Sequence, residues 1–174
     1  MKKMKKTAVL FALLLSAAVL ASCRRSSGLP EEPDGFTFSL TWGCYGISSY
    51  DSSTGQLVKT TDASNPEDYV TTCRLTAEEL SQIYDILREL DVESYPDTYN
   101  PHKNGLASVP PMTLILTVRA NTIQKTITAE NIAYTDGADN AKGQAFLDAC
   151  REIRDILTAT DEWKALPEYE VIYD

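Results

Sequence analysis

The sequence of 174 residues predicts an α+β fold, in which an antiparallel sheet of hairpins carries two main helices on one face. Short runs of alternating apolar and polar residues are joined by turn-forming residues, as in hairpins. Two longer stretches repeat apolar residues at helical spacing, one between the strand runs and one after them. A parallel sheet needs a long crossover after every strand, so this order favours an antiparallel sheet.

The first half of the chain contains four predicted strands. The run 36–42 alternates apolar and polar residues, which places its four apolar side chains on one face. Gly55 adopts positive φ readily and closes a turn that joins the next two strands into a hairpin. The strands are predicted at 36–42, 45–50, 56–60 and 69–74.

A helix is predicted over 77–90 by a cap and an apolar stripe. Thr76 and Glu79 have the spacing of a capping box, in which each side chain satisfies a backbone N–H of the other residue. Apolar residues then follow helical spacing, so one side of this helix is expected to face the sheet. These residues are Leu80, Ile83, Tyr84, Leu87 and Leu90.

The second half contains a hairpin and a second helix. Strands are expected at 112–119 and 122–129, with Ala120 and Asn121 forming the turn. A helix over 139–159 presents an apolar stripe, and residues 169–173 could add a short edge strand. The stripe consists of Phe146, Ala149, Cys150, Ile153, Ile156 and Leu157.

The first 23 residues have the features of a secretory signal. Four lysines precede an uncharged, mostly apolar stretch over 7–22, and small residues lead into Cys23. Leu20-Ala21-Ser22-Cys23 resembles the lipobox of bacterial lipoproteins, which implies that Cys23 receives a diacylglyceryl thioether and becomes the mature N-terminus. Two acyl chains on one sulfur would give durable membrane attachment. A simple cleaved signal and a retained anchor are the alternatives.

This interpretation divides the chain into a signal peptide (1–22), a flexible tether (23–35) and a single α+β domain (36–174). The tether is rich in Ser, Gly, Pro and Glu, a composition that cannot bury much apolar surface. Loss of the four signal lysines takes the formal charge from −9 to −13. Such an acidic chain is not expected to bind nucleic acid, whose binders carry a basic surface.

The cysteines allow more than one state. With Cys23 lipidated, Cys44, Cys73 and Cys150 remain in an extracytoplasmic setting. Cys150 lies on the apolar stripe of the last helix and is expected in the core. A disulfide between Cys44 and Cys73 is left open, because it depends on a Cα separation that the sequence does not supply.

No motif predicts catalysis, a metal or a cofactor. His102 is the sole histidine, and no local motif pairs it with Cys44 as a nucleophile and base. The segment from Asp136 fails as a calcium loop because Ala141 and Leu147 occupy its sixth and twelfth positions. Paired carboxylates fall on predicted helix turns and solvated faces, so we expect neither a catalytic pair nor a bound cofactor.

The loop Ser94–Pro111 is the remaining candidate site. It contains Tyr95, Tyr99, His102 and Lys103, and long loops without secondary structure are often functional. Tyrosine and histidine present wide amphipathic surface for contacts. The alternative is a proline-stiffened connector whose tyrosines pack back on the core.

The layout of the mature domain resembles small uncharacterised bacterial envelope domains, through its early Gly-Cys-Tyr strand, its helix opening Leu-Thr-x-Glu-Glu and its terminal helix. This resemblance implies no activity. We therefore expect a lipid-anchored, extracytoplasmic envelope protein with a non-catalytic role, which binds an envelope protein or a small ligand. The alternative is an enzyme or enzyme inhibitor that acts through the Ser94–Pro111 loop.

Overall fold

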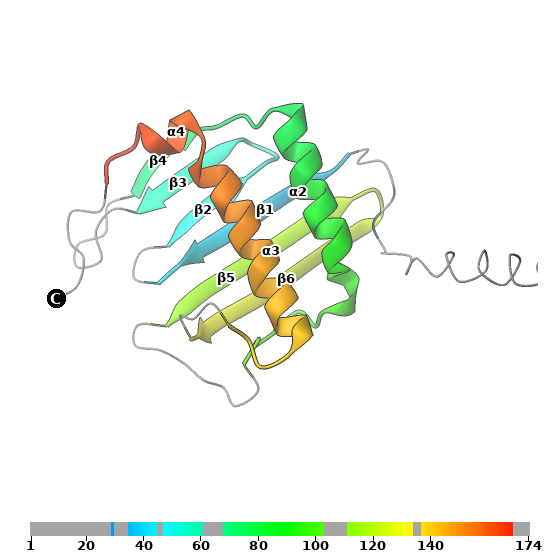
Figure 1. The fold of residues 1–174 in the computed structure, drawn as a ribbon. Coiled ribbons are helices and arrows are strands. Elements are labelled where there is room, and N and C mark those ends of the chain that lie inside the picture. The colour runs from blue at the N-terminus through cyan, green and yellow to red at the C-terminus, as the bar shows by residue number, and fades with distance from the viewer. Residues whose placement is uncertain are drawn as a thin grey trace, which may run out of the picture.

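A six-stranded antiparallel sheet with two main helices on one face forms the domain, which confirms the predicted α+β class (Figure 1). The computed structural model describes residues 29, 35–44, 47–60, 68–102, 111–133 and 137–168. The strand order is β4-β3-β2-β1-β5-β6, so the chain runs outward through three hairpins and returns to the other side of β1. The strands are β1 (Thr37–Gly43), β2 (Ser48–Asp51), β3 (Gln56–Thr60), β4 (Asp68–Thr72), β5 (Met112–Ala120) and β6 (Ile123–Ile132).

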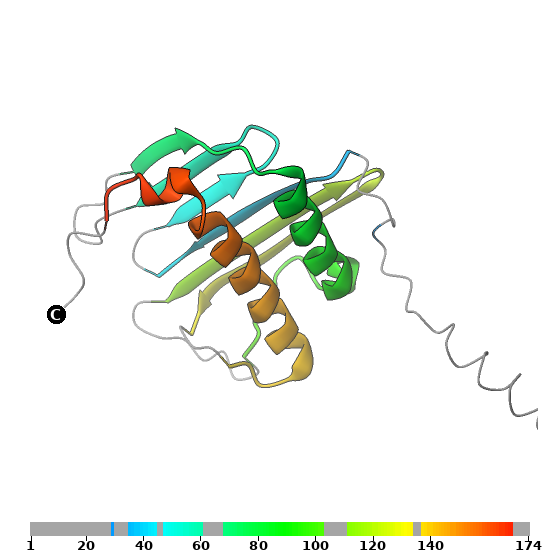
Figure 2. The ribbon, with the colours of Figure 1, turned by 45° about the horizontal axis from the view of Figure 1, so that its top comes forward.

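The helices are α2 (Ala77–Leu90), the 3₁₀ turn η2 (Val92–Ser94), α3 (Ala141–Thr158) and the short α4 (Asp161–Lys164). The predicted capping box at the start of α2 is present, with Thr76 Oγ1 accepting from the Glu79 N–H. Asn140 caps α3 through the Gly143 N–H. Figures 1 and 2 show α2 and α3 lying side by side across the same face of the sheet.

The core lies between that sheet face and the two helices. Register pairs Leu40 of β1 with Tyr50 of β2 and with Leu116 of β5, so these inward side chains form a continuous row. All three are buried, as are Ile83 of α2 and Ile153 of α3. The apolar face of the sheet therefore packs against the apolar stripes of the two helices, as the sequence predicts.

The opposite face of the sheet carries mostly hydroxyl-bearing and β-branched side chains. None of the described helices covers it, as expected for an antiparallel sheet with one solvated face. One row across all six strands consists of Thr128, Ile115, Thr41, Ser49, Val58 and Val70. Val70, on the edge strand β4, is 58% exposed.

The second hairpin turn differs by one residue from the prediction. Ala120 pairs with Ile123, so the turn consists of Asn121 and Thr122. Asn121 has φ of 51°, a left-handed conformation that asparagine tolerates better than most residues. Beyond β6, Thr98 forms a bridge with Thr128, which gives that edge a partner within the chain. The edge strand predicted at 169–173 lies outside the described residues.

Leu29 changes the predicted boundary between tether and domain. Its side chain is only 4% exposed and belongs to the same cluster as the strands and helices. Five residues lie between it and Cys23. The interpretation of 23–35 as a free tether is therefore wrong at this position, because an isolated apolar residue in a polar segment gives no periodic signal.

We predict that Leu29→Ala lowers the free energy of unfolding by about 2–4 kcal/mol, because it removes a buried side chain from a packed core. Urea unfolding followed by circular dichroism would measure the change. Val70→Ala, at an exposed position, serves as the control and should change the value by less than about 0.5 kcal/mol. Equal small effects at both positions would contradict the burial of Leu29.

Candidate functional site

The predicted lipidation residue, Cys23, lies outside the described residues. Within the described part of the chain, no helix is both long and apolar enough to cross a membrane. Those residues also include no group of three or more His, Cys, Asp or Glu side chains that could hold a metal ion.

The disulfide left open between Cys44 and Cys73 is not formed. Cys44 follows β1 at the end of the sheet where Trp42 pairs with Ser48. Cys73 follows β4 at the other end, where its N–H donates to the Gly55 carbonyl at 2.8 Å. Strands of four or five residues are about 13–17 Å long, whereas a disulfide needs Cα atoms about 4–7 Å apart. The two cysteines are thus too far apart to be joined.

Cys73 and Cys150 are both buried thiols. Cys73 lies under α4, with its Sγ 3.8 Å from the Glu162 carboxylate. Burial raises the pKa of the Cys73 thiol and raises that of Cys150 to about 12. A nucleophilic cysteine needs a lowered pKa, so neither environment activates a thiolate. The prediction that Cys150 belongs to the core is confirmed.

Tyr95 and Tyr99, proposed above as contact residues of a loop, pack against the helical layer instead. Their rings lie 5.8 and 5.5 Å from the ring of Phe146 on α3, and the Tyr95 hydroxyl donates to the Lys142 carbonyl at 2.9 Å. The Lys142 ammonium sits 4.5 Å from the centre of the Tyr95 ring. This packing matches the connector interpretation of the loop.

His102 is also buried, with 3% of its surface exposed. Its backbone N–H donates to Asn100 Oδ1 at 2.8 Å, while its Nε2 has no hydrogen-bond partner among the described residues. The adjoining Pro101 carbonyl would lie 2.7 Å from a Cβ on Gly143, so the loop is pressed against the start of α3. Lys103 lies outside the described residues.

A shallow depression lies over α2 and α3, and we call it the acidic groove. One part is a hollow of about 150 Å³ between the helices. The other is a more open hollow of about 520 Å³ along α2, and the two share Ile86 and Glu89 in their linings. The interhelical hollow is lined by Ile86, Glu89, Leu90, Ala145, Asp148, Ala149 and Glu152. The hollow along α2 is lined by Glu78, Ser81, Gln82, Asp85, Ile86 and Glu89.

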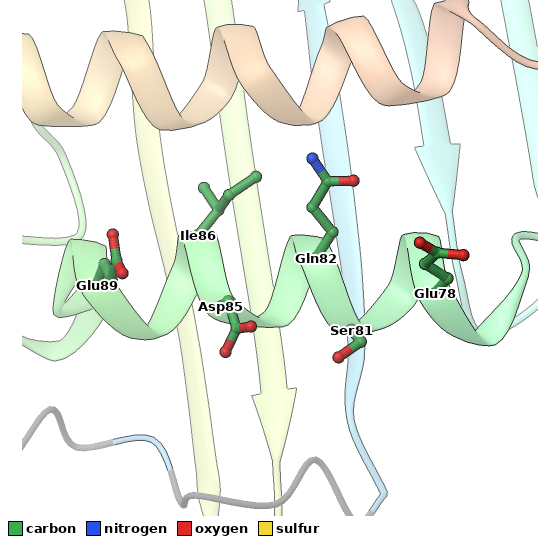
Figure 3. Close-up of a pocket in the computed structure, with 6 residues that line it drawn as sticks. All are labelled: Glu78, Ser81, Gln82, Asp85, Ile86 and Glu89. Carbon is green, nitrogen blue, oxygen red and sulfur yellow. The ribbon is translucent and has the colours of Figure 1, made fainter.

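The floor of the groove is apolar and small. Figure 3 shows the Ile86 side chain pointing from α2 toward α3, with Glu78 and Glu89 at the two ends of the hollow along α2. Ala145 and Ala149 lie one turn apart on α3, and both line the hollow between the helices. This open hollow of about 150 Å³ has apolar side chains beside the carboxylates of Glu89, Asp148 and Glu152, so a partner there would meet both kinds of surface.

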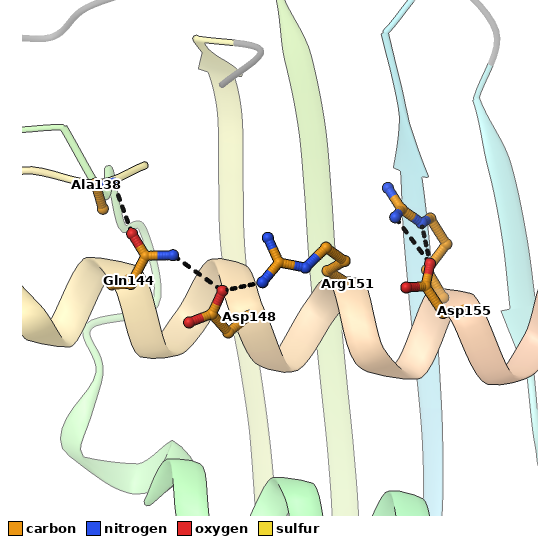
Figure 4. A network of polar contacts seen from close by, with 6 residues as sticks. Ala138, Gln144, Asp148, Arg151 and Asp155 are labelled. Atoms are coloured by element: carbon orange, nitrogen blue, oxygen red, sulfur yellow. Dashed lines mark hydrogen bonds and ion pairs between the residues drawn. The ribbon is translucent and has the colours of Figure 1, made fainter. Parts of the chain in front are cut away.

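The rim of the groove is anionic. Asp85 pairs with Arg88 at 3.0 Å, and Asp148 pairs with Arg151. On α3, Figure 4 shows the chain of contacts that runs from Gln144 through Asp148 to Arg151. By contrast, the described residues provide no ion-pair partner for Glu78, Glu89 and Glu152. Five carboxylates thus line the groove beside its apolar side chains, and three of them have no ion-pair partner among the described residues.

Sequence reasoning missed this groove. The acids of α2 recur at spacings of seven and four residues, which places Glu78, Asp85 and Glu89 on one helix face. That pattern was visible in the sequence, but it equally fits an ordinary solvated face. The deciding fact is that α3 lies beside this face, and helix adjacency was not in the local pattern.

Neither a protein-family model nor a curated protein matches this sequence. The site must therefore be interpreted from its own geometry.

We predict that the free energy of unfolding falls as pH rises from about 9 to 12. Burial raises the pKa of Cys150 from its ordinary value of 9.0, and those of Tyr50 and Tyr95 from 10.0, to about 12 in each case. The unfolded groups release their protons first, so alkaline pH favours the unfolded state. Urea midpoints at pH 8, 9.5 and 10.5 would measure the decline.

Cys150→Ala is the matched variant for this test, because Cys150 has the lowest ordinary pKa of these three groups and therefore ionises before the two tyrosines in the unfolded chain. Its midpoint should fall less steeply than that of the wild type between pH 8 and 9.5. A wild-type midpoint that is unchanged up to pH 10.5 would contradict the assigned burial of these groups.

Proposed function

We propose that the protein is a lipid-anchored envelope protein that binds a partner at the membrane surface and catalyses no reaction. The carrying observation is the short distance along the chain between the lipobox cysteine and the core. Leu29 is buried six residues after Cys23, and six residues span at most about 20 Å. A lipid on Cys23 would thus hold the domain close to the headgroups.

Charge indicates which side of the domain is available to a partner. The chain without its signal carries a formal charge of −13, and the helical layer bears groove acids that have no ion-pair partner among the described residues. Anionic headgroups repel such a surface within about a Debye length, 8–10 Å at physiological salt. An anionic bilayer would therefore repel the helical layer and leave it accessible to a second protein.

The alternative function, an enzyme or inhibitor acting through the Ser94–Pro111 loop, receives less support. Catalysis at this loop would require its titratable groups to meet a substrate. Tyr95 and His102 are buried, and Tyr95 and Tyr99 pack against Phe146. Burial raises the pKa of Tyr95 to about 12, which makes it a poor base at neutral pH.

The anchor can be tested by metabolic labelling with an alkyne fatty acid in bacterial cells. We expect the wild-type protein to carry the label on an N-terminal peptide that begins at Cys23, and Cys23→Ala to carry none, because a thioether cannot form without the thiol. Cys44→Ala is the matched control and should label like the wild type. Label retained by Cys23→Ala, or absent from the wild type, would overturn the proposed anchor.

A further inference from the structure

The acidic groove has two chemical features that must be satisfied together. Three of its carboxylates have no ion-pair partner in the described part of the chain, and Ile86, Ala145 and Ala149 line it as well. Apolar surface at the floor favours an apolar side chain of a partner, while the rim favours cations. An occupant with only one of these features would leave the other unmatched.

We propose that the acidic groove binds a basic amphipathic helix of a partner protein, which places one apolar side chain over Ile86 and pairs lysine or arginine side chains with Glu78, Glu89 and Glu152. This inference rests on the proposed binding role and names the class of partner. It does not depend on the lipid anchor.

The spacing of the acids favours a helix. Glu78 and Glu89 are eleven residues apart on α2, which corresponds to about 17 Å along the axis. A helix lying along the groove has the same rise per residue, so cations three, four, seven and eleven residues apart on one face can meet these acids. Helices with an apolar face commonly dock in grooves of this kind.

Other occupants fit less well. A second copy of this chain would bring the same acids to the groove, and like charges brought together at an interface cost several kcal/mol. Nucleic acid and anionic lipid are repelled for the same reason. A small polycation matches the rim but offers nothing to the apolar floor.

The probe is a synthetic 18-residue helical peptide with lysines along one face and a single leucine among them. Its scrambled counterpart has the same composition and therefore the same charge, but its lysines are spread around the helix instead of lying on one face. Binding is measured by fluorescence anisotropy to the protein purified from bacterial cells in a neutral detergent, a preparation that does not require the lipid anchor. We expect the patterned peptide to bind at least 10-fold tighter than the scrambled one, and more weakly as salt is raised.

Charge reversal within the groove should remove this binding. The double variant Glu89→Lys with Glu152→Lys is expected to lower the affinity for the patterned peptide at least 10-fold. The matched control, Glu130→Lys with Asp161→Lys, changes the net charge equally at exposed acids of β6 and α4. It should weaken binding less than 3-fold, because only the overall field changes.

Ile86→Asp separates contact from charge. It adds a negative charge, so a purely electrostatic attraction would raise the affinity for the patterned peptide. If the apolar contact matters, its loss lowers that affinity at least 5-fold. Circular dichroism and urea unfolding would establish that the variant is folded, and Ile86→Ala serves as a milder second variant expected to weaken binding about 3-fold.

Several results would overturn the inference. These are equal affinity for the patterned and scrambled peptides, equal weakening by the two double variants, tighter binding by Ile86→Asp, or displacement of the peptide by spermine at equal charge concentration. Fatty-acid labelling of Cys23 is a separate readout, so failure of the anchor and failure of the groove can be told apart.

Discussion

Burial of a single sheet face is the constraint on which the rest of this structure depends. β1 and β5 pair in the centre of the sheet, and their alternating sequences put every large apolar side chain except Ile115 on one side. Both helices carry one apolar stripe, so both must lie on that side, next to each other. The groove between α2 and α3 follows from this adjacency. Small residues at Ala145 and Ala149 leave a hollow there where larger side chains would have filled it.

The same constraint determines which surfaces carry the charged residues. The outer surfaces of α2 and α3 are the solvated side of the core layer, so acids collect there, whereas the uncovered sheet face carries mainly threonine, serine and valine. Arg88 and Arg151 each neutralise a neighbouring aspartate on their own helix. Pairs of this kind add little stability at an exposed position. Their consequence is electrostatic, because they leave the remaining glutamates as the dominant charges of the groove.

The elements with local signals could be predicted, and the long-range relations could not. A capping box and a continuous apolar stripe defined α2 to the residue, since both signals lie within the helix itself. Cys44 and Cys73 both flank early strands, yet the register places them at opposite ends of the sheet, and register is a property of the pairing. Tyrosines such as Tyr95 and Tyr99 suit an exposed loop, and the sequence does not show that Phe146 packs against them. Whether Glu89 and Glu152 share a surface likewise depends on helix packing.

The buried Leu29 also has a mechanical consequence. In a lipid-anchored protein, a load pulling the domain away from the membrane would act first on the packed Leu29 and then on β1. This strand lies between β2 and β5 and is hydrogen-bonded along both of its edges, so its extraction along the strand axis would require many hydrogen bonds to break together. An edge strand could instead peel away one bond at a time. The chain thus enters its domain at a place suited to bearing load.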